Sequence, residues 1–447
     1  MPAAAPAILS ASMATSTIAA ADVRARLRLP DSISVLAERD FRVIWTGSAI
    51  SLVGTWMQVI AQGLVVLSLW NSALALGIVN VAQSLPTLAV MLFGGVLADR
   101  ADKRLILLVT QTIMALLAFA VGVLVLTGAV QFWMLLVIAA GLGVAFGYDM
   151  PAYQALLPEL VEPEKIGQVV ALNSSTFHGS RMIGPAIAGA AIAAFGFSVA
   201  YFLNAASFLA VIVSLLIIRS RPRRDGPAAG TSAIDGLKEG LRHAAGRPNL
   251  RVMLLITALN TTFVFPSLAV LMPLYAKDVL HEGASVLGLL MAAAGVGSMI
   301  GALMLIWWAD RLREARIWFG AVAAPSGLVL LAVTREPAIA IAVSGLVSFA
   351  FSSQLGLITQ MIQESTPSQF RGRVMSLFGI TFNGTMPFAG LATAALAVAF
   401  GLPAVMVVAA VCYAALAAWL LVFAAGGIGA VVRASTAEYE LVAAGGG

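Results

Sequence analysis

The sequence predicts an all-α membrane protein with twelve transmembrane helices in two six-helix halves. Hydrophobic residues make up 60% of the 447 residues and charged residues only 11%, and the mean hydropathy is +0.97, which is more apolar than soluble domains are. Long runs without a charge fit one or two membrane crossings of about 20 residues each. The tripeptide Ala-Asp-Arg occurs at residues 98–100 and again at 309–311, each time at the end of such a run. This repeat indicates a duplicated helix bundle, which is typical of secondary transporters.

The charge-free runs give the predicted spans in chain order. The first half holds three pairs of helices, with turns expected at Trp70-Asn71-Ser72 and around residues 195–197; the runs are 43–98, 105–148 and 166–218. The second half holds four single spans and a closing pair split near residues 401–403; these are 252–276, 283–309, 317–334, 337–363 and the pair in 374–432. The expected organisation is a tail, a bundle, a linker, a second bundle and a tail, at residues 1–40, 41–218, 219–249, 250–432 and 433–447.

The distribution of Lys and Arg sets the orientation. If both termini are cytoplasmic, all but three of the 26 Lys and Arg residues lie on the cytoplasmic side, as expected for a correctly oriented membrane protein. The exceptions are Lys277 and Arg335 on the outer side and Arg181 within a span. We therefore expect a multi-pass protein of the plasma (inner) membrane with both ends inside. The same bias explains the net charge of +5, so no nucleic-acid partner is expected.

The sequence contains no signature of an enzyme. It has three histidines and one cysteine, Cys412, and lacks His-Glu-x-x-His, Gly-x-Ser-x-Gly and a Walker loop. No metal, no cofactor and no ATP-driven step is therefore expected. The first 23 residues do not resemble a signal peptide and predict a disordered tail. Residues 24–42 suit either a surface helix or an unstructured leader, and the linker should contain one short helix around residues 236–241.

The loop after the second span carries a glycine and charge motif. Its sequence, Gly-Gly-Val-Leu-Ala-Asp-Arg-Ala-Asp-Lys-Arg at residues 94–104, resembles the signature loop of the major facilitator superfamily. The resemblance extends over about residues 41–432 and implies that fold. In physical terms, Gly94 and Gly95 allow another helix to pack closely, and Asp99 can accept hydrogen bonds from a helix N-terminus. With Arg100 and Arg104, these residues are expected to gate the transport path.

The second Ala-Asp-Arg copy and the start of the eleventh helix are expected to take part in the same gate. The copy lacks the leading glycines, but Asp310 and Arg311 occupy the corresponding positions. Asp99 should contact the helix that begins at Arg371 and Arg373 when the inner side is closed. Contacts that form in one state and break in the other would stabilise the two states differently.

Further motifs narrow the resemblance to one branch of the superfamily. Residues 150–161, 173–174 and 181–189, together with 363–367 and 371–376, are similar to the branch with enterobactin-type siderophore exporters and macrolide efflux proteins. Gly184, Pro185 and Gly189 resemble the fifth-helix motif associated with exporters, which implies outward transport. From physics alone, a proline within a span and small neighbours predict a kinked, closely packed helix.

Three titratable residues inside predicted spans are candidates for coupling. Asp149 could carry a proton, or it could be a fixed partner of Arg181 or of a loop cation. Arg181 lies too deep to reach the inner surface easily. His178 precedes it by one turn and is either titratable in the useful pH range or a packing residue. The fourth helix lacks the arginine that many drug and proton antiporters carry there, which weakens the expectation of proton coupling.

Uncharged polar and aromatic side chains in the first and seventh spans are candidates for lining a substrate cavity, because these two spans face the central pathway in the resembled superfamily. One residue of the eleventh span is a further candidate. The candidates are Trp56, Gln58, Gln62, Asn260, Phe263, Phe265 and Asn383. Such a mixture suits an amphiphilic substrate. We expect a monomeric, proton-driven exporter of a drug or siderophore embedded in the lipid bilayer. A translocator of lysophospholipid or another lipid is the alternative, and a membrane-embedded enzyme is disfavoured.

Overall fold

The structure is a computed structural model that describes residues 31–100, 102–162, 165–218, 233–307 and 312–444. All regular secondary structure in these ranges is helical. Eleven of the helices are long and apolar enough to cross a membrane. The predicted all-α membrane class is therefore confirmed for the part of the chain that the structure describes.

The first bundle consists of six long helices, all close to the predicted boundaries. They are α2 (Arg39–Trp70), α3 (Ala73–Arg100), α4 (Lys103–Leu126), α5 (Phe132–Leu156), α6 (Ile166–Phe195) and α7 (Ser198–Ile217). The two predicted turns are present. Asn71 adopts the left-handed conformation with φ of 45° and donates its N–H to the carbonyl of Leu67, which ends α2. Gly196, with φ of 84°, ends α6 and donates its N–H to the carbonyl of Ile192.

The second bundle begins with a span that is broken, although the sequence predicts a continuous helix over residues 252–276. It runs through α9 (Pro248–Leu259), the π-helical turn η4 (Asn260–Val264), α10 (Phe265–Ala269), α11 (Met272–Leu274) and the π-helical turn η5 (Tyr275–Val279). Pro266 and Pro273 each lack the N–H that a continuous helix would use. Val270 and Leu271 separate α10 from α11, and both donate their N–H to the carbonyl of Pro266.

The remaining helices of the second bundle follow the predicted order. They are α12 (Ala284–Trp307), α13 (Arg313–Val333), α14 (Pro337–Glu364), α15 (Ser368–Gly379) with η6 (Ile380–Gly384) and α16 (Thr385–Phe400), and α17 (Leu402–Phe423). The last apolar run does not continue to Val432 as predicted. Gly426 and Gly427, with φ of 80° and 86°, separate α17 from a further helix, α18 (Ile428–Ala444). Most of the predicted C-terminal tail is therefore helical.

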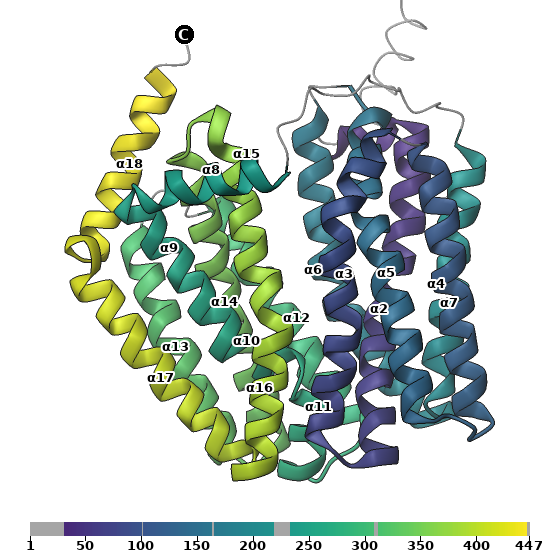
Figure 1. Cartoon of the computed structure of the whole chain (residues 1–447). Coiled ribbons are helices and arrows are strands. Elements are labelled where there is room, and N and C mark those ends of the chain that lie inside the picture. The colour runs from purple at the N-terminus through teal and green to yellow at the C-terminus, as the bar shows by residue number, and fades with distance from the viewer. Residues whose placement is uncertain (1–30, 101, 163–164, 219–232, 308–311, 445–447) are drawn as a thin grey trace, which may run out of the picture.

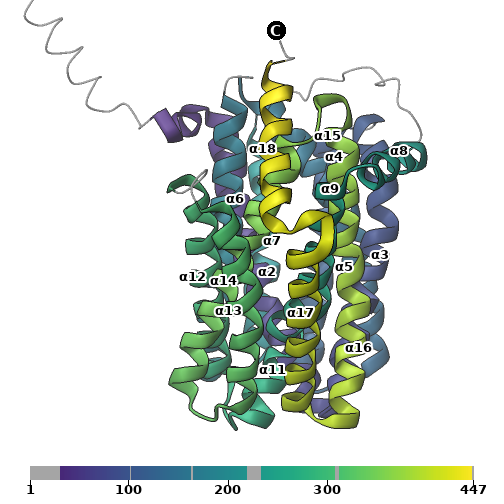
Figure 2. The same ribbon diagram turned by 90° about the vertical axis from the view of Figure 1, so that its left-hand side faces the viewer.

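Short elements lie at one end of the molecule. The 3-10 helix η1 (Asp31–Ala37) precedes α2, and the N–H of Val35 donates to Gln168 Oε1 at 2.8 Å. The predicted linker helix is present as α8 (Ala233–Ala245). It packs on α15, where His243 stacks on Phe370 with 4.3 Å between ring centroids. Figures 1 and 2 show α8, α15 and α18 at the same end.

The two bundles lie side by side and approach each other closely through glycines. Figure 1 shows α2 to α7 on one side and α13 to α17 on the other. Where α6 meets α12, a Cβ added to Gly189 would lie 2.8 Å from the carbonyl O of Ala284, and one added to Gly288 would lie 2.8 Å from the carbonyl O of Pro185. Small residues thus let the helix backbones touch, as in many membrane helix pairs.

Candidate functional site

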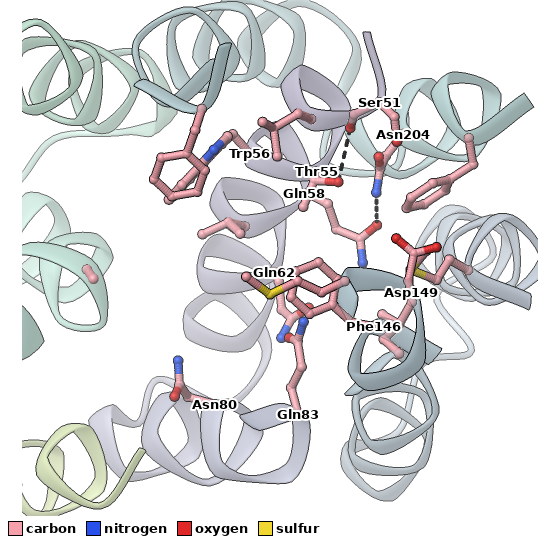
Figure 3. Close-up of a pocket in the computed structure, with 18 of the residues that line it drawn as sticks. Ser51, Thr55, Trp56, Gln58, Gln62, Asn80, Gln83, Phe146, Asp149 and Asn204 are labelled. Atoms are coloured by element: carbon pink, nitrogen blue, oxygen red, sulfur yellow. Dashed lines mark hydrogen bonds between the residues drawn. The ribbon is translucent and has the colours of Figure 1, made fainter. Parts of the chain in front are cut away.

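A cavity of about 430 Å³ lies among the helices of the first bundle and reaches the broken span of the second. Helices α2 to α7 provide most of its wall, and the second bundle contributes Ala269, Val270 and Pro273. Trp56, Gln58 and Gln62, which the sequence marks as candidates, line it (Figure 3). This size is within the range of cavities that bind small molecules.

The cavity wall combines amides with aromatic and aliphatic surface. Asn204 Nδ2 donates to Gln58 Oε1 at 2.6 Å, and Ser207 Oγ donates to Asn204 Oδ1 at 3.0 Å. The lining also includes amides and aromatic rings that the sequence analysis did not single out, namely Asn80, Gln83, Gln111, Phe146 and Phe177. They are uncharged polar or aromatic residues of predicted spans, so the signal that identified Gln58 was present in α3 to α6 as well.

Asp149 provides a carboxylate in the cavity wall. It lies on α5, is only 8% exposed, and its Oδ1 accepts hydrogen bonds from Thr110 Oγ1 at 2.6 Å and from Gln111 Nε2 at 3.0 Å. Both donors are neutral and belong to α4. Among the residues that the structure describes, no cation forms an ion pair with Asp149. A buried carboxylate held by neutral donors can gain or lose a proton without breaking an ion pair.

Arg181 lies on α6 at the contact between the two bundles. Its guanidinium carbon is 5.6 Å from the ring centroid of Trp56 on α2 and 5.9 Å from that of Phe265 on α10. The side chain is 9% exposed. The backbone of His178 lies one turn earlier in the same helix, and its side chain is outside the described part of the structure.

The second-bundle candidates lie away from the cavity wall. Asn260 is fully buried and donates to Gln354 Oε1 at 2.9 Å, which also accepts from the hydroxyl of Tyr413 at 3.0 Å. Phe265 packs against the rings of other aromatic residues, and Phe263 packs in the hydrophobic core. Asn383 is exposed and donates to the carbonyl of Gly379 at 3.1 Å. None of these four residues lines the cavity in this structure.

The residues of the predicted exporter motif lie at two helix contacts. A Cβ on Gly184 would lie 2.6 Å from the Cβ of Trp56 and 2.8 Å from the carbonyl O of Val53, so α6 and α2 are in close contact there. Pro185 and Gly189 face α12, as described above. The close packing predicted from small residues is present at both positions.

Only part of the predicted gate can be described. Gly94, Gly95, Asp99 and Arg100 belong to α3, but their side chains lie outside the described structure, as do Asp310, Arg311 and the side chain of Arg371. Arg104 donates through Nη2 to the carbonyl of Leu216 at 3.2 Å. Arg373 forms an ion pair with Glu239 of the linker helix α8 and lies 5.6 Å from the ring centroid of Phe370. In the second bundle, Arg313 pairs with Glu364 at 2.8 Å.

Two bundles of apolar helices and a cavity with a mixed polar and apolar lining are typical of a membrane transporter, and comparisons with known proteins agree. The chain belongs to a family of the major facilitator superfamily described as transmembrane secretion effector, whose profile matches residues 31–439. Its relatives are transporters of this superfamily rather than enzymes.

Three relatives indicate the branch of the superfamily. The multidrug efflux pump Tap of Mycolicibacterium fortuitum is 25% identical over 359 residues, 78% of this chain and 87% of that protein. The staphyloferrin A transporter of Staphylococcus aureus is 25% identical over 59% of this chain and 66% of its own length. The macrolide efflux protein A of Streptococcus pyogenes is 23% identical over 80% of this chain and 88% of its own. These relatives are drug and siderophore transporters, and the chain is similar to them over most of its length.

Solved structures support the fold. A bacterial homologue of the human lysosomal transporter Spinster, in an inward-facing and unoccupied conformation, aligns over 90% of this chain and 98% of its own, with a TM-score of 0.65 and 14% identity. A transporter of the POT family in complex with a thioalcohol-conjugated peptide aligns over 86% of this chain and 96% of its own, with a TM-score of 0.68 and 11% identity. At these identities the likeness concerns the fold alone.

Proposed function

We propose that the protein is a secondary active exporter that moves an amphiphilic small molecule out of the cell by alternating access, with protons as the coupling ion. The observation that carries this proposal is the cavity with its mixed lining. The ring of Trp56 and the ring of Phe146 offer apolar surface, while Gln62 and Gln83 offer hydrogen-bonding groups. The printed names of the relatives, which include drug, macrolide and siderophore transporters, support this substrate class.

The arrangement of the bundles supports alternating access. At the end that carries Asn71 and Lys277 the two bundles are in contact, and Lys277 Nζ donates to Asn71 Oδ1 there at 2.7 Å. Toward the opposite end, the described lining residues, such as Ser48, Tyr153 and Asn173, all belong to the first bundle. We propose that this end faces the cytoplasm and that the structure represents an inward-facing state. Rocking of one bundle against the other would then open the opposite end.

The proposed topology has twelve spans with both termini in the cytoplasm and the protein in the plasma membrane. Eleven spans follow from length and hydropathy. We add α6 as the twelfth because it is 30 residues long and packs between α2, α7 and α12. Its first half is polar, which is expected of a helix that faces a cavity. The bias of Lys and Arg described above sets the orientation. We propose that each chain contains a complete pathway and functions as a monomer.

The proposed gate and the proposed proton carrier have separate roles. Asp99, Arg100 and Arg104, with Asp310, Arg311, Arg371 and Arg373, would stabilise the closed inner side when the two bundles approach there. Asp149 would carry the proton, because it lies in the cavity wall with neutral hydrogen-bond donors. A carboxylate in this position can be exposed to each side in turn as the bundles move.

The test is energised efflux of N-phenyl-1-naphthylamine, a fluorescent amphiphile, from cells that express the protein. Efflux should require the protein and should stop when a protonophore is added. It should also be lost in Asp149→Asn at equal protein abundance. The matched control is Asp278→Asn, which removes an exposed carboxylate outside the cavity and should transport like the wild type. Efflux that persists with the protonophore and in Asp149→Asn would contradict proton coupling through this residue.

A further inference from the structure

Arg181 is a buried cation without a polar partner among the residues that the structure describes. The side chain is 9% exposed, and within the described part of the chain it makes no hydrogen bond and no ion pair. A guanidinium carries five N–H donors, and burying a charge without compensating hydrogen bonds is strongly unfavourable. Intramembrane ionisable residues of this kind usually have a functional reason. Another buried arginine, Arg316, shows the contrast because it donates to Ser353 Oγ and to the Ser353 carbonyl O.

The surroundings of Arg181 supply attraction but no acceptor. The rings of Trp56 and Phe265 lie near the guanidinium, and aromatic faces attract a cation. The two rings do not accept hydrogen bonds from the N–H groups, which point outward in the plane of the guanidinium. The one carboxylate of the cavity wall described above, Asp149, is bonded to Thr110 and Gln111 instead. Among the described side chains none accepts a hydrogen bond from Arg181, so its donors are available to an acceptor from outside the protein.

Arg181 adjoins the cavity at a defined place. Asn173, Thr176 and Phe177 of α6 line the cavity, and Arg181 follows Phe177 by four residues, so it lies on the same helix face about 6 Å further along. Phe177 and Trp56 form an edge-to-face pair with ring centroids 5.9 Å apart. Arg181 thus lies just beyond an aromatic pair that forms part of the cavity wall.

We propose that Arg181 binds an anionic oxygen group of the transported molecule, so that the preferred substrates are acidic amphiphiles such as carboxylates or sulfonates. This inference rests on the export function proposed above and specifies the substrate class. The apolar body of the substrate lies in the cavity against Trp56 and Phe177, and its anionic group accepts hydrogen bonds from the guanidinium. Charge-assisted hydrogen bonds to arginine are stronger than neutral ones and are often bidentate.

The proposal also connects substrate to the second bundle. Phe265, the second ring beside Arg181, begins α10, the segment of the broken span that ends at Ala269 in the cavity wall. An anion at Arg181 therefore contacts the place where both bundles meet. A ligand that binds one arrangement of this contact better than the other shifts the equilibrium between the two states.

The experiment compares two probes that share one ring system and differ by a sulfonate: 8-anilinonaphthalene-1-sulfonate and N-phenyl-1-naphthylamine. Their affinities are measured by fluorescence with the full-length protein in phosphatidylcholine nanodiscs, after subtraction of empty nanodiscs. In Arg181→Gln, the ratio of the affinity for the sulfonate to that for the neutral probe should fall at least about tenfold. Arg181→Lys should retain part of the preference. In the control Arg316→Gln, the ratio should remain that of the wild type.

The outcomes separate this inference from the export proposal. The inference is wrong, while the export proposal stands, if the wild type binds both probes and Arg181→Gln leaves the ratio of the two affinities unchanged. This holds whether the variant lowers both affinities equally or changes neither affinity. If the wild type binds neither probe, both are wrong. If Arg181→Gln does not fold, a displacement measurement on the wild-type protein tests the inference. Bound sulfonate probe should be displaced by 2-naphthoate and not by 2-naphthamide at the same concentration, and equal displacement would overturn the inference.

Discussion

Lys277 and Asn71 join the two bundles at one end of the molecule. Lys277 Nζ donates to Asn71 Oδ1 at 2.7 Å and to the carbonyl O of Leu67 at 3.1 Å. Asn71 is in position because its left-handed conformation ends α2, and Lys277 belongs to η5 at the end of the broken span. Lys277 was noted in the sequence only as an exception to the distribution of positive charge. The contact with Asn71 explains why a lysine lies at this position.

Removing the Lys277 contact should favour opening of this end. In Lys277→Met both hydrogen bonds are lost, and we expect the equilibrium to shift toward the other state by about 1 kcal/mol, or roughly fivefold. The shift can be measured as distances between spin labels at Ser72→Cys and His281→Cys. Cys412 is the only cysteine of the sequence, so Cys412→Ala gives a cysteine-free protein into which the two labelling sites are introduced.

The matched control for this experiment is Arg335→Met. Arg335 is the other cation that the distribution of Lys and Arg predicts on the outer side. Among the described residues it donates only to carbonyls near its own position in the chain, those of Ala332 and Thr334. Its removal should leave the distance distribution unchanged. A distribution that is identical in Lys277→Met and the wild type would show that the contact does not contribute to closure.

The glycine contact between α6 and α12 should not tolerate a methyl group. In Gly189→Ala the new Cβ would lie 2.8 Å from the carbonyl O of Ala284, so the helices must separate. We expect a loss of stability of about 1–3 kcal/mol, as for other overpacked sites, and reduced transport. Thermal unfolding of the purified protein measures the first effect.

Gly179 offers a control within the same helix. No atom lies within 4 Å of a Cβ added there, so Gly179→Ala should be neutral or should raise the melting temperature slightly, since alanine favours helix. Equal melting temperatures for the two variants would show that the close approach at Gly189 has no energetic consequence.

The hydrogen-bond network of the second bundle should contribute to stability rather than to substrate binding. Gln354 accepts from Asn260 and Tyr413 and donates to the carbonyl of Ile317 at 2.8 Å. In Gln354→Leu these buried groups lose their partner, and we expect a loss of about 1–3 kcal/mol. The affinity for N-phenyl-1-naphthylamine should stay within about twofold of the wild type. A large change in affinity with unchanged melting temperature would instead place this network in the substrate path.

Much of the fold could be predicted from the sequence because charge-free runs and turn residues are local signals. The turn at Asn71 and the end of α6 at Gly196 followed directly from them. The break between α10 and α11 was not predicted, although Pro266 and Pro273 were visible. Proline is tolerated in transmembrane helices when neighbours satisfy the freed groups, so sequence alone does not show which proline interrupts a span.

The candidate site could be predicted only in part, because contacts across the bundle are not local. Gln58 and Gln62 line the cavity as expected, whereas Asn260, an amide of the same kind, is enclosed by Gln354 and Tyr413. Nothing in the sequence near Asn260 distinguishes these two environments. Likewise, the partners of Asp149 are Thr110 and Gln111 on α4, which a search for opposite charges does not find.

Proton-coupled transport by the purified protein tests the central claim most directly. Proteoliposomes that contain the protein are prepared with a lumen that is more acidic than the external buffer. The entry of N-phenyl-1-naphthylamine is recorded together with the pH of the lumen. The account predicts that the probe accumulates and protons leave in the wild type, and that both fluxes are lost in Asp149→Asn while probe binding remains. Accumulation that does not depend on the pH gradient, or an Asp149→Asn variant that moves probe and protons like the wild type, would contradict it.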